Sequence, residues 1–315
     1  MSTIICKNEI ENWVKTVHKY AKLPGGISFT IENRVLNVML RCDIKNMQDD
    51  DAAFEAWIIF LMSHFGSAFN SVVLYLDNII LSPRFNQLLW RISNFKKMFP
   101  WFDVDPDLSR IVENFLKNVF NNVKVNEPSC ARSAVINSDG ERFVEWKIKS
   151  QNPNPLKSLT CCDELENQIP VGIFSNYVSK DSRIFPGGAS AIDLMGLDKE
   201  NQMLHVFELK IKDNCKMGII SEYLYYIQIV YNIFVTKQIN YEGYVSLMGC
   251  ANFQNFRANR IVGHLMAEKF HPLLDRLTIG LLNQGLSTIN ITTDLIKYEF
   301  DADIGGINKI DYYQN

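Results

Sequence analysis

The fold of the second half of the chain is decided by residues 187–211, which read GGASAIDLMGLDKENQMLHVFELKI. Two apolar runs, 189–197 and 203–211, flank a polar stretch at 198–202. Turn-forming polar residues between two runs of strand-forming residues indicate a β-hairpin. Because both runs are apolar at most positions, we expect strands that are buried on both faces.

Three charged side chains interrupt these apolar runs, Asp193 in the first and Glu208 and Lys210 in the second. Side chains alternate across a strand, so Glu208 and Lys210 lie on one face, about 6.5–7 Å apart along the chain. The hairpin can bring Asp193 beside Glu208. The alternative is an exposed hairpin with a surface ion pair, which contributes about 0–1 kcal/mol. The apolar flanks argue against it, because charges in an apolar interior are costly unless they compensate one another.

The chemistry of these three groups indicates metal-assisted phosphodiester hydrolysis. Two carboxylates a few ångströms apart form a hard oxygen site that suits Mg²⁺ or Mn²⁺. The metal lowers the pKa of the attacking water and offsets charge in the transition state. Lys210 can orient or help to deprotonate that water, or neutralise charge on a phosphate oxygen.

In this order, Asp193, a hairpin and Glu208-Leu209-Lys210 resemble the PD-(D/E)XK nuclease superfamily, which has the restriction-endonuclease-like fold. The resemblance covers about residues 158–250. It implies that Asp193 and Glu208 ligate the metal together with the backbone carbonyl of Leu209, and that Lys210 serves the attacking water. Ile192 stands where the name of the superfamily has proline, a departure that many members share.

The resemblance also implies an acidic residue on the helix before the first of these strands. We predict that helix from Leu156 to about Phe174, interrupted near Pro170. Its candidates are Glu166, which directly precedes an apolar stretch, and Glu164. A solvated helix face explains either glutamate equally well.

The helix expected at 218–234 is unusually apolar and aromatic, and Glu222 is the only acid in its first three turns. Tyr226 follows Glu222 by one turn on the same helix face. We therefore expect Glu222 and Tyr226 at the site, and Gln228 resembles polar residues that related nucleases place on this helix. The alternative is an aromatic stripe that packs on the sheet, with Glu222 capping a loop.

The first half of the chain reads as a small α/β unit, and residues 122–160, which are rich in Asn, Ser, Pro and Lys, separate it from the rest. We therefore predict an N-terminal domain at 1–125 and a nuclease-like domain at 126–315, with a central mixed sheet flanked by helices. Expected helices in the first half are 1–22, 52–65 (opened by three aspartates at 49–51), 84–98 and 106–121, and expected strands are 27–31, 35–40 and 71–76. Further elements expected in the second half are strands at 143–148, 242–249 and 288–300 and helices at about 255–270 and on to 284.

Composition limits the classes of function. The 315 residues carry 32 Lys and Arg against 35 Asp and Glu, a net charge of −3, which excludes a strongly basic nucleic-acid coat but allows a local basic groove. Seven cysteines without CxxC spacing indicate free thiols in a reducing cytosol. The longest apolar stretch, 56–62, is far too short to span a membrane, and no signal peptide is visible at the start.

Together with the resemblance, these observations lead us to expect a cytoplasmic Mg²⁺- or Mn²⁺-dependent nuclease that acts on DNA. A role in restriction, phage defence or repair is what the resemblance implies. The N-terminal domain would serve binding, dimerisation or regulation. By analogy a homodimer is expected, because cutting both strands needs two sites. One alternative is a catalytically inactive nuclease-like module that binds nucleic acid or protein. Another is an accidental motif in an α/β protein that binds a small ligand or another protein.

Overall fold

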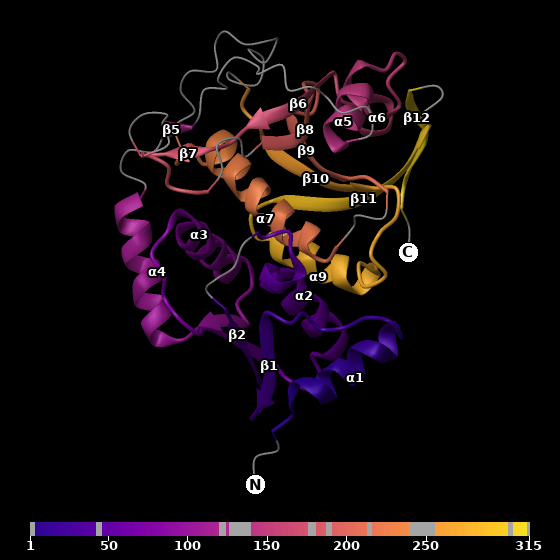
Figure 1. Cartoon of the computed structure of the whole chain (residues 1–315). Coiled ribbons are helices and arrows are strands. Elements are labelled where there is room, and N and C mark those ends of the chain that lie inside the picture. The colour runs from indigo at the N-terminus through magenta and orange to yellow at the C-terminus, as the bar shows by residue number, and fades with distance from the viewer. Residues whose placement is uncertain are drawn as a thin grey trace.

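A computed structural model describes residues 4–41, 46–119, 124–125, 140–175, 181–186, 191–212, 216–239, 256–301 and 305–313. The chain forms two separate main sheets with helices packed against them, the first in the lower half of Figure 1 and the second in the upper half. The predicted α/β class, with a mixed sheet flanked by helices, is confirmed. The predicted boundary near residue 125 adjoins 126–139, outside the described residues, and stays a prediction.

The first sheet has the strand order β1-β2-β3-β4. Its β1–β2 hairpin turns through Asn33 and Arg34, both with positive φ, as a two-residue hairpin turn requires. The other neighbours, β2–β3 and β3–β4, run parallel. The elements of this half are α1 (Lys7–Val17), β1 (Ile27–Glu32), β2 (Val35–Leu40), the 3₁₀ helix η1 (Asp50–Ala52), α2 (Phe54–Phe65), β3 (Ser71–Leu76), α3 (Pro83–Met98), β4 (Phe102–Val104) and α4 (Pro106–Val119).

The second sheet has the order β12-β11-β10-β9-β8-β6 and is mixed. The pairs β9–β10 and β10–β11 are parallel. The pairs β6–β8, β8–β9 and β11–β12 are antiparallel. The predicted hairpin is the β8–β9 pair of this sheet. The strands are β6 (Glu164–Pro170), β8 (Ala191–Asp198), β9 (Met203–Lys210), β10 (Arg260–Ala267), β11 (Ile291–Asp301) and β12 (Gly306–Tyr312), and β5 (Lys124–Val125) pairs separately with β7 (Ile173–Phe174).

Helices cover both faces of this sheet. On one face Val206 and Leu204 of β9 belong to the same buried cluster as α7 (Gly218–Val230), which continues as the π-helical turn η3 (Tyr231–Val235). On the other face Phe207 and Leu209 pack with α5 (Glu141–Ser150) and α6 (Pro155–Thr160). Glu208 and Lys210 alternate with Phe207 and Leu209 and therefore project toward α7.

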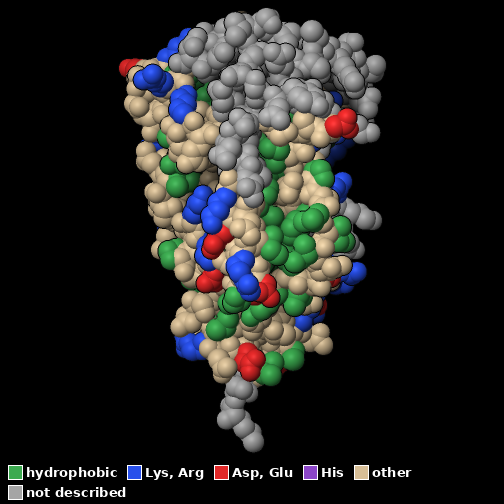
Figure 2. Space-filling model, turned by 90° about the vertical axis from the view of Figure 1, so that its left-hand side faces the viewer, with side chains coloured by type: hydrophobic (Ala, Val, Ile, Leu, Met, Phe, Trp, Pro, Cys, Tyr) green, Lys and Arg blue, Asp and Glu red, His purple; other side chains and the backbone are tan. Residues whose placement is uncertain are grey.

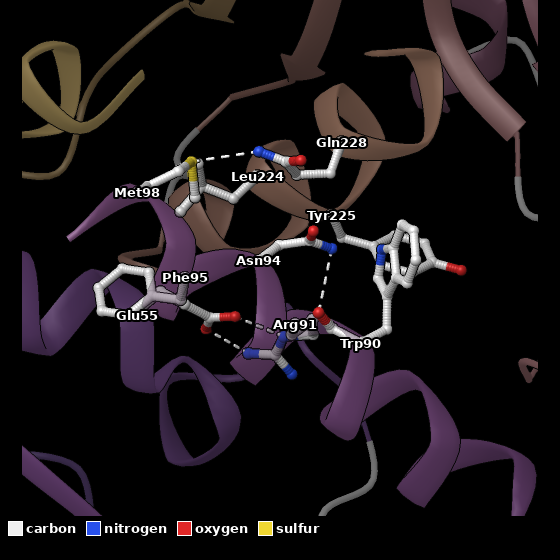
Figure 3. A pocket seen from close by; sticks show the side chains of 9 residues that line it. All are labelled: Glu55, Trp90, Arg91, Asn94, Phe95, Met98, Leu224, Tyr225 and Gln228. Carbon is white, nitrogen blue, oxygen red and sulfur yellow. Dashed lines mark hydrogen bonds and ion pairs between the residues drawn. The ribbon is translucent and has the colours of Figure 1, made fainter. Parts of the chain in front are cut away.

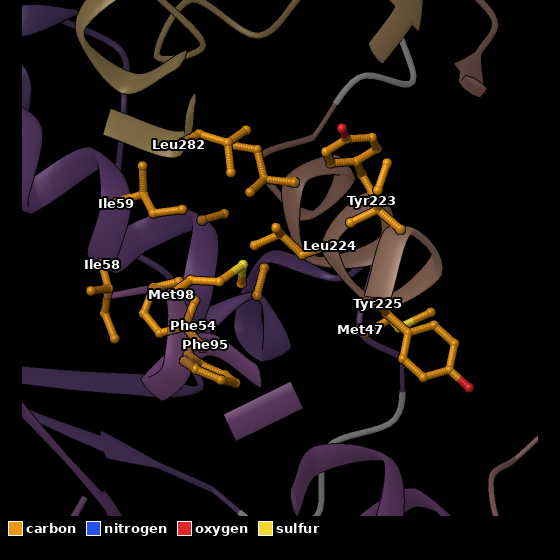
Figure 4. Close-up of a cluster of buried hydrophobic side chains, with 14 of the residues drawn as sticks. Met47, Phe54, Ile58, Ile59, Phe95, Met98, Tyr223, Leu224, Tyr225 and Leu282 are labelled. Atoms are coloured by element: carbon orange, nitrogen blue, oxygen red, sulfur yellow. The ribbon is translucent and has the colours of Figure 1, made fainter. Parts of the chain in front are cut away.

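The two halves share one hydrophobic core, in which α2 and α3 of the first half meet α7 and α9 (Arg276–Ser287) of the second. Figure 4 shows Phe54, Met98 and Leu224 of α2, α3 and α7 close together in this core, with Leu282 of α9 beside them. The first half is therefore packed directly on α7, the helix that faces Glu208 and Lys210.

Three sequence predictions in the second half are wrong. Residues 143–148 belong to a helix, α5, and its buried residues Val144, Glu145 and Ile148 have helical rather than alternating spacing. The helix predicted from Leu156 ends at Thr160, after which the chain forms the strand β6. The segment 143–148 has only six residues, which is too few to distinguish the 3.6-residue period of a helix from the two-residue period of a strand.

The third error concerns 260–267, which form the strand β10 instead of the helix expected at about 255–270. Seven of its eight residues are buried because β10 lies in the middle of the sheet, so its sequence shows no alternation. Residues 189–190 of the first strand prediction and the strand expected at 242–249 lie outside the described residues. Among the described helices none is both long and apolar enough to cross a membrane.

Candidate active site

The β8–β9 hairpin places Asp193, Glu208 and Lys210 together. The strands pair from Asp198↔Met203 to Leu194↔Phe207, and Asp193 is the next residue along β8. Its Oδ2 accepts a hydrogen bond from the backbone N–H of Leu209, at 2.8 Å. The carboxylate of Asp193 therefore lies beside the backbone between Glu208 and Lys210.

The ammonium of Lys210 is the centre of the cluster. Its Nζ lies 2.5 Å from Oε1 of Glu208, 3.2 Å from Oε2 of Glu222 and 3.3 Å from Oε1 of Glu141. These carboxylates come from β9, α7 and α5. Lys210, Glu208 and Glu222 are 6%, 2% and 4% exposed, so they form a buried floor, whereas Glu141 is partly open to solvent.

Two acidic residues of this site, Glu141 and Glu145 of α5, were missed in the sequence. Glu145 is buried; its Oε2 accepts a hydrogen bond from Nε2 of Gln168 at 2.6 Å, and its Oε1 has no hydrogen-bond partner. Two like charges four residues apart destabilise an exposed helix. The four-residue spacing of Glu141 and Glu145 could have pointed to a site, but only if residues 141–150 had been recognised as a helix.

Carboxyl groups outnumber ammonium groups in this cluster. Burial raises the pKa of Asp193 well above its usual value, and Glu145 and Glu141 raise it further against the lowering effect of Lys210. Burial likewise raises the pKa of Glu208, with Asp193 adding to the effect. Within the described part of the chain, the cluster therefore contains five carboxyl groups and a single ammonium, that of Lys210. The members of the acidic cluster are Glu141, Glu145, Asp193, Glu208 and Glu222.

Lys210 and Glu145 differ in their protonation. Burial alone would lower the pKa of Lys210, but the carboxylates of Glu208 and Glu222 outweigh burial and hold it well above its usual value. Lys210 is therefore charged at neutral pH. Burial raises the pKa of Glu145 to about 7, so this group exchanges its proton near neutral pH.

The donor set suits a hard divalent cation in chemical type and in charge. Carboxylate oxygens are the ligands that Mg²⁺ and Mn²⁺ prefer. Two buried carboxylate oxygens, Oε1 of Glu145 and Oε2 of Glu222, accept no hydrogen bond, although the latter lies near Lys210. However, no three His, Cys, Asp or Glu side chains within the described ranges are arranged to hold one ion. Lys210 occupies the point on which they converge, and a metal would require its ammonium to turn away.

The remaining predicted residues divide into two groups. Tyr226 belongs to the site, because burial and then the carboxylates of Glu222 and Glu208 raise the pKa of its hydroxyl. Gln228 instead faces α3, where its Nε2 donates to Sδ of Met98 at 3.1 Å. Figure 3 shows it lining a small cavity between α3 and α7, whose volume of about 10 Å³ holds roughly one water molecule.

Neither Glu164 nor Glu166 reaches the cluster. Both lie on β6, at the edge of the sheet, and not on a helix. Glu164 pairs with Lys199 and Glu166 pairs with Lys149. The acidic residues of the cluster that lie on a helix before β8 are Glu141 and Glu145 of α5, which precedes β6 by two elements.

Gln48, from the first half of the chain, also contacts the site. Its Nε2 donates a hydrogen bond to Oε1 of Glu222 across 174 positions of sequence. No local pattern marks this residue.

Comparison of the chain with family models, with curated proteins and with solved structures found no match.

Proposed function

We propose that the chain is a divalent-metal-dependent nuclease of the PD-(D/E)XK type, which hydrolyses phosphodiester bonds in DNA. The observation that carries the proposal is the convergence of the half-buried Asp193 with the buried Glu208 and Lys210 on one hairpin, inside a mixed sheet covered by helices. Glu141 and Glu145 on α5 support it, because they supply the helical acid that the resemblance implies.

Asp193 and Glu208 are the residues proposed to hold Mg²⁺ or Mn²⁺, with the carbonyl of Leu209. A metal bound there supplies a water of lowered pKa and offsets charge at the phosphate. Because Lys210 is held in its charged form, we assign it to stabilising negative charge on a phosphate oxygen rather than to taking up a proton.

The proton from the attacking water is assigned to Glu145 instead. A general base works best when its pKa is near the working pH, and burial brings the pKa of Glu145 to about 7. Tyr226 keeps its proton, since burial raises its pKa well above the usual value, and its hydroxyl can donate a hydrogen bond within the cluster.

DNA as the substrate, a role in restriction, phage defence or repair, a homodimer and a cytoplasmic location are proposed on the resemblance and the cysteine content. The described part of the face in Figure 2 shows Lys and Arg side chains interspersed with acidic ones rather than gathered in one band. We therefore expect affinity for nucleic acid to come from a few local phosphate contacts and to fall steeply with salt.

One observation favours a second candidate, an inactive nuclease-like binding module. The ammonium of Lys210 already neutralises part of the acidic cluster at the point where a metal would lie. In such a module the charges would serve stability only.

The test is cleavage of supercoiled plasmid, single-stranded DNA and RNA with Mg²⁺ or Mn²⁺. We compare the wild type with Asp193→Asn and Lys210→Met, and we use Glu164→Gln as a matched control because this acid lies in the same sheet outside the cluster. Metal-dependent cleavage that is lost in the first two variants and kept in the control is expected. Absence of both cleavage and Mn²⁺ binding by calorimetry would favour the inactive module.

A further inference from the structure

Residues 46–52, between the first sheet and α2, are fastened to the start of α7. Met47 is 8% exposed, and its side chain lies in the shared core near α7 in Figure 4. The carboxylate of Asp50 accepts a hydrogen bond from the backbone N–H of Gly218 at 3.3 Å. Met217 occupies the N-cap position of α7, but its side chain accepts no hydrogen bond from the helix. Asp50 therefore satisfies one of the N–H groups that the start of the helix leaves free.

The backbones of the two segments are in close contact. A Cβ added at Gly218 would lie 1.9 Å from the carbonyl oxygen of Gln48. Any side chain at position 218 would therefore push the segment away. This contact fixes the backbone of Gln48 relative to α7 and hence relative to Glu222.

From this position the side chain of Gln48 holds one oxygen of a site carboxylate. Its amide donates to Oε1 of Glu222, while Oε2 of Glu222 lies 3.2 Å from Nζ of Lys210. The two oxygens of one carboxylate thus face two different donors. An amide adds no charge, so Glu222 keeps its full attraction for Lys210.

We infer that Gln48 is a positioning residue of the site: it fixes the orientation of Glu222, and through Glu222 the place of the Lys210 ammonium between Glu222 and Glu208. For its effect on turnover the inference rests on the nuclease function proposed above. The first half of the chain then contributes directly to the site, through residues 46–52.

The test compares Gln48→Ala and Gln48→Glu with Asp49→Asn. The control residue is next in the chain and forms an exposed ion pair with Lys216 (3.4 Å), so its loss reports the purely structural role of the segment. Gln48→Glu keeps the length of the side chain and replaces the donor by a carboxylate that repels Glu222. Folding of each variant is checked by its thermal unfolding midpoint.

The decisive readout is the ¹⁵N NMR signal of the Lys210 ammonium at one fixed pH in metal-free protein, assigned with Lys210→Arg. We expect it to shift or broaden in Gln48→Ala, more strongly in Gln48→Glu, and to stay unchanged in Asp49→Asn. A Lys210 signal that is the same in all folded variants would overturn the inference, whether or not the protein cleaves nucleic acid.

Turnover gives the second readout. A misplaced site group costs catalysis more than binding, so we expect kcat to fall roughly 10-fold or more in Gln48→Ala with KM for DNA within about 2-fold. If the Lys210 signal responds but the wild type cleaves nothing, the positioning role stands and the nuclease function fails. If cleavage is present and kcat is unaffected by both Gln48 variants, the inference fails and the nuclease function stands.

Discussion

Nζ of Lys210 lies 2.5 Å from Oε1 of Glu208, although the two side chains leave the same strand only two residues apart. An extended strand separates such side chains by about 6.5–7 Å at their origins, so they must lean toward one another. The lean brings the ammonium within reach of Glu222 from α7 and Glu141 from α5. Lys210 thus joins carboxylates from three elements, β9, α7 and α5.

Loss of Lys210 should destabilise the fold. In Lys210→Met the buried Glu208 and Glu222 have no cation, and removal of one partner of a buried pair costs about 3–5 kcal/mol. We expect this loss at pH 8 and a smaller one at pH 5.5, where the raised pKa of Glu208 lets that group take up a proton. Urea unfolding at both pH values measures it. The double variant Lys210→Met, Glu208→Gln should regain part of the stability; equal losses for the single and double variants would contradict the buried pair.

The hairpin and its three charges were predictable because they depend only on local rules. Strand alternation puts Glu208 and Lys210 on one face, and a short turn forces the two runs together. Glu141 and Glu145 were not predictable to the same degree, because a short stretch around them fits either a strand or a helix. The error also moved the expected helical acid to Glu164 or Glu166, which the structure places on an edge strand.

Contacts between distant segments had no local signal. The hydrogen bond from Gln48 to Glu222 joins positions 174 residues apart, and it depends on how α2 and α7 pack. From the sequence, the three aspartates at 49–51 indicate only favourable charge at the start of a helix. In the structure Asp49 and Asp50 contact Lys216 and Gly218 at the start of α7, and Asp51 contacts Gly26 before β1.

A buried histidine pair should make the protein sensitive to acid. Nδ1 of His205 on β9 lies 2.9 Å from Nε2 of His264 on β10, and the two ring planes are parallel to within 1°. Burial lowers the pKa of His205 from 6.5 to about 4. The unfolded chain binds protons first as the pH falls, so stability is complete above about pH 6.5 and is lost as the pH falls toward 4, by roughly 1–3 kcal/mol.

This loss is measured by urea unfolding at pH 7.5, 6 and 4.5. His264→Met removes one of the two groups and should reduce the slope of stability against pH. The same slope in the wild type and in His264→Met would show that the pair is not responsible.

Two glycines of α9 offer a matched test of the shared core. A Cβ at Gly285 would lie 2.2 Å from the ring of Phe99, whereas a Cβ at Gly280 would meet no atom within 4 Å. Gly285→Ala should therefore destabilise the protein by about 1–3 kcal/mol through overpacking. Gly280→Ala should stabilise it by about 0.5–1 kcal/mol, because alanine favours the helix. Chemical denaturation measures both, and similar effects at the two positions would contradict the close packing of α9 on the first half.

Replacement of Glu145 should raise stability and lower activity together. Burial raises the pKa of this carboxyl from 4.5 to about 7, so the folded state holds a proton that the unfolded state has released. Stability therefore falls as the pH rises from about 4.5 to about 7, and Glu145→Gln removes this penalty. We expect the variant to gain roughly 1–3 kcal/mol over the wild type at pH 8 and little at pH 5. Glu164→Gln, on the edge strand, should show no such gain.

If Glu145 takes the proton of the attacking water, the stabilised Glu145→Gln variant loses roughly 10²-fold or more of its cleavage rate. A variant that is both stabilised and fully active would remove Glu145 from the proposed mechanism.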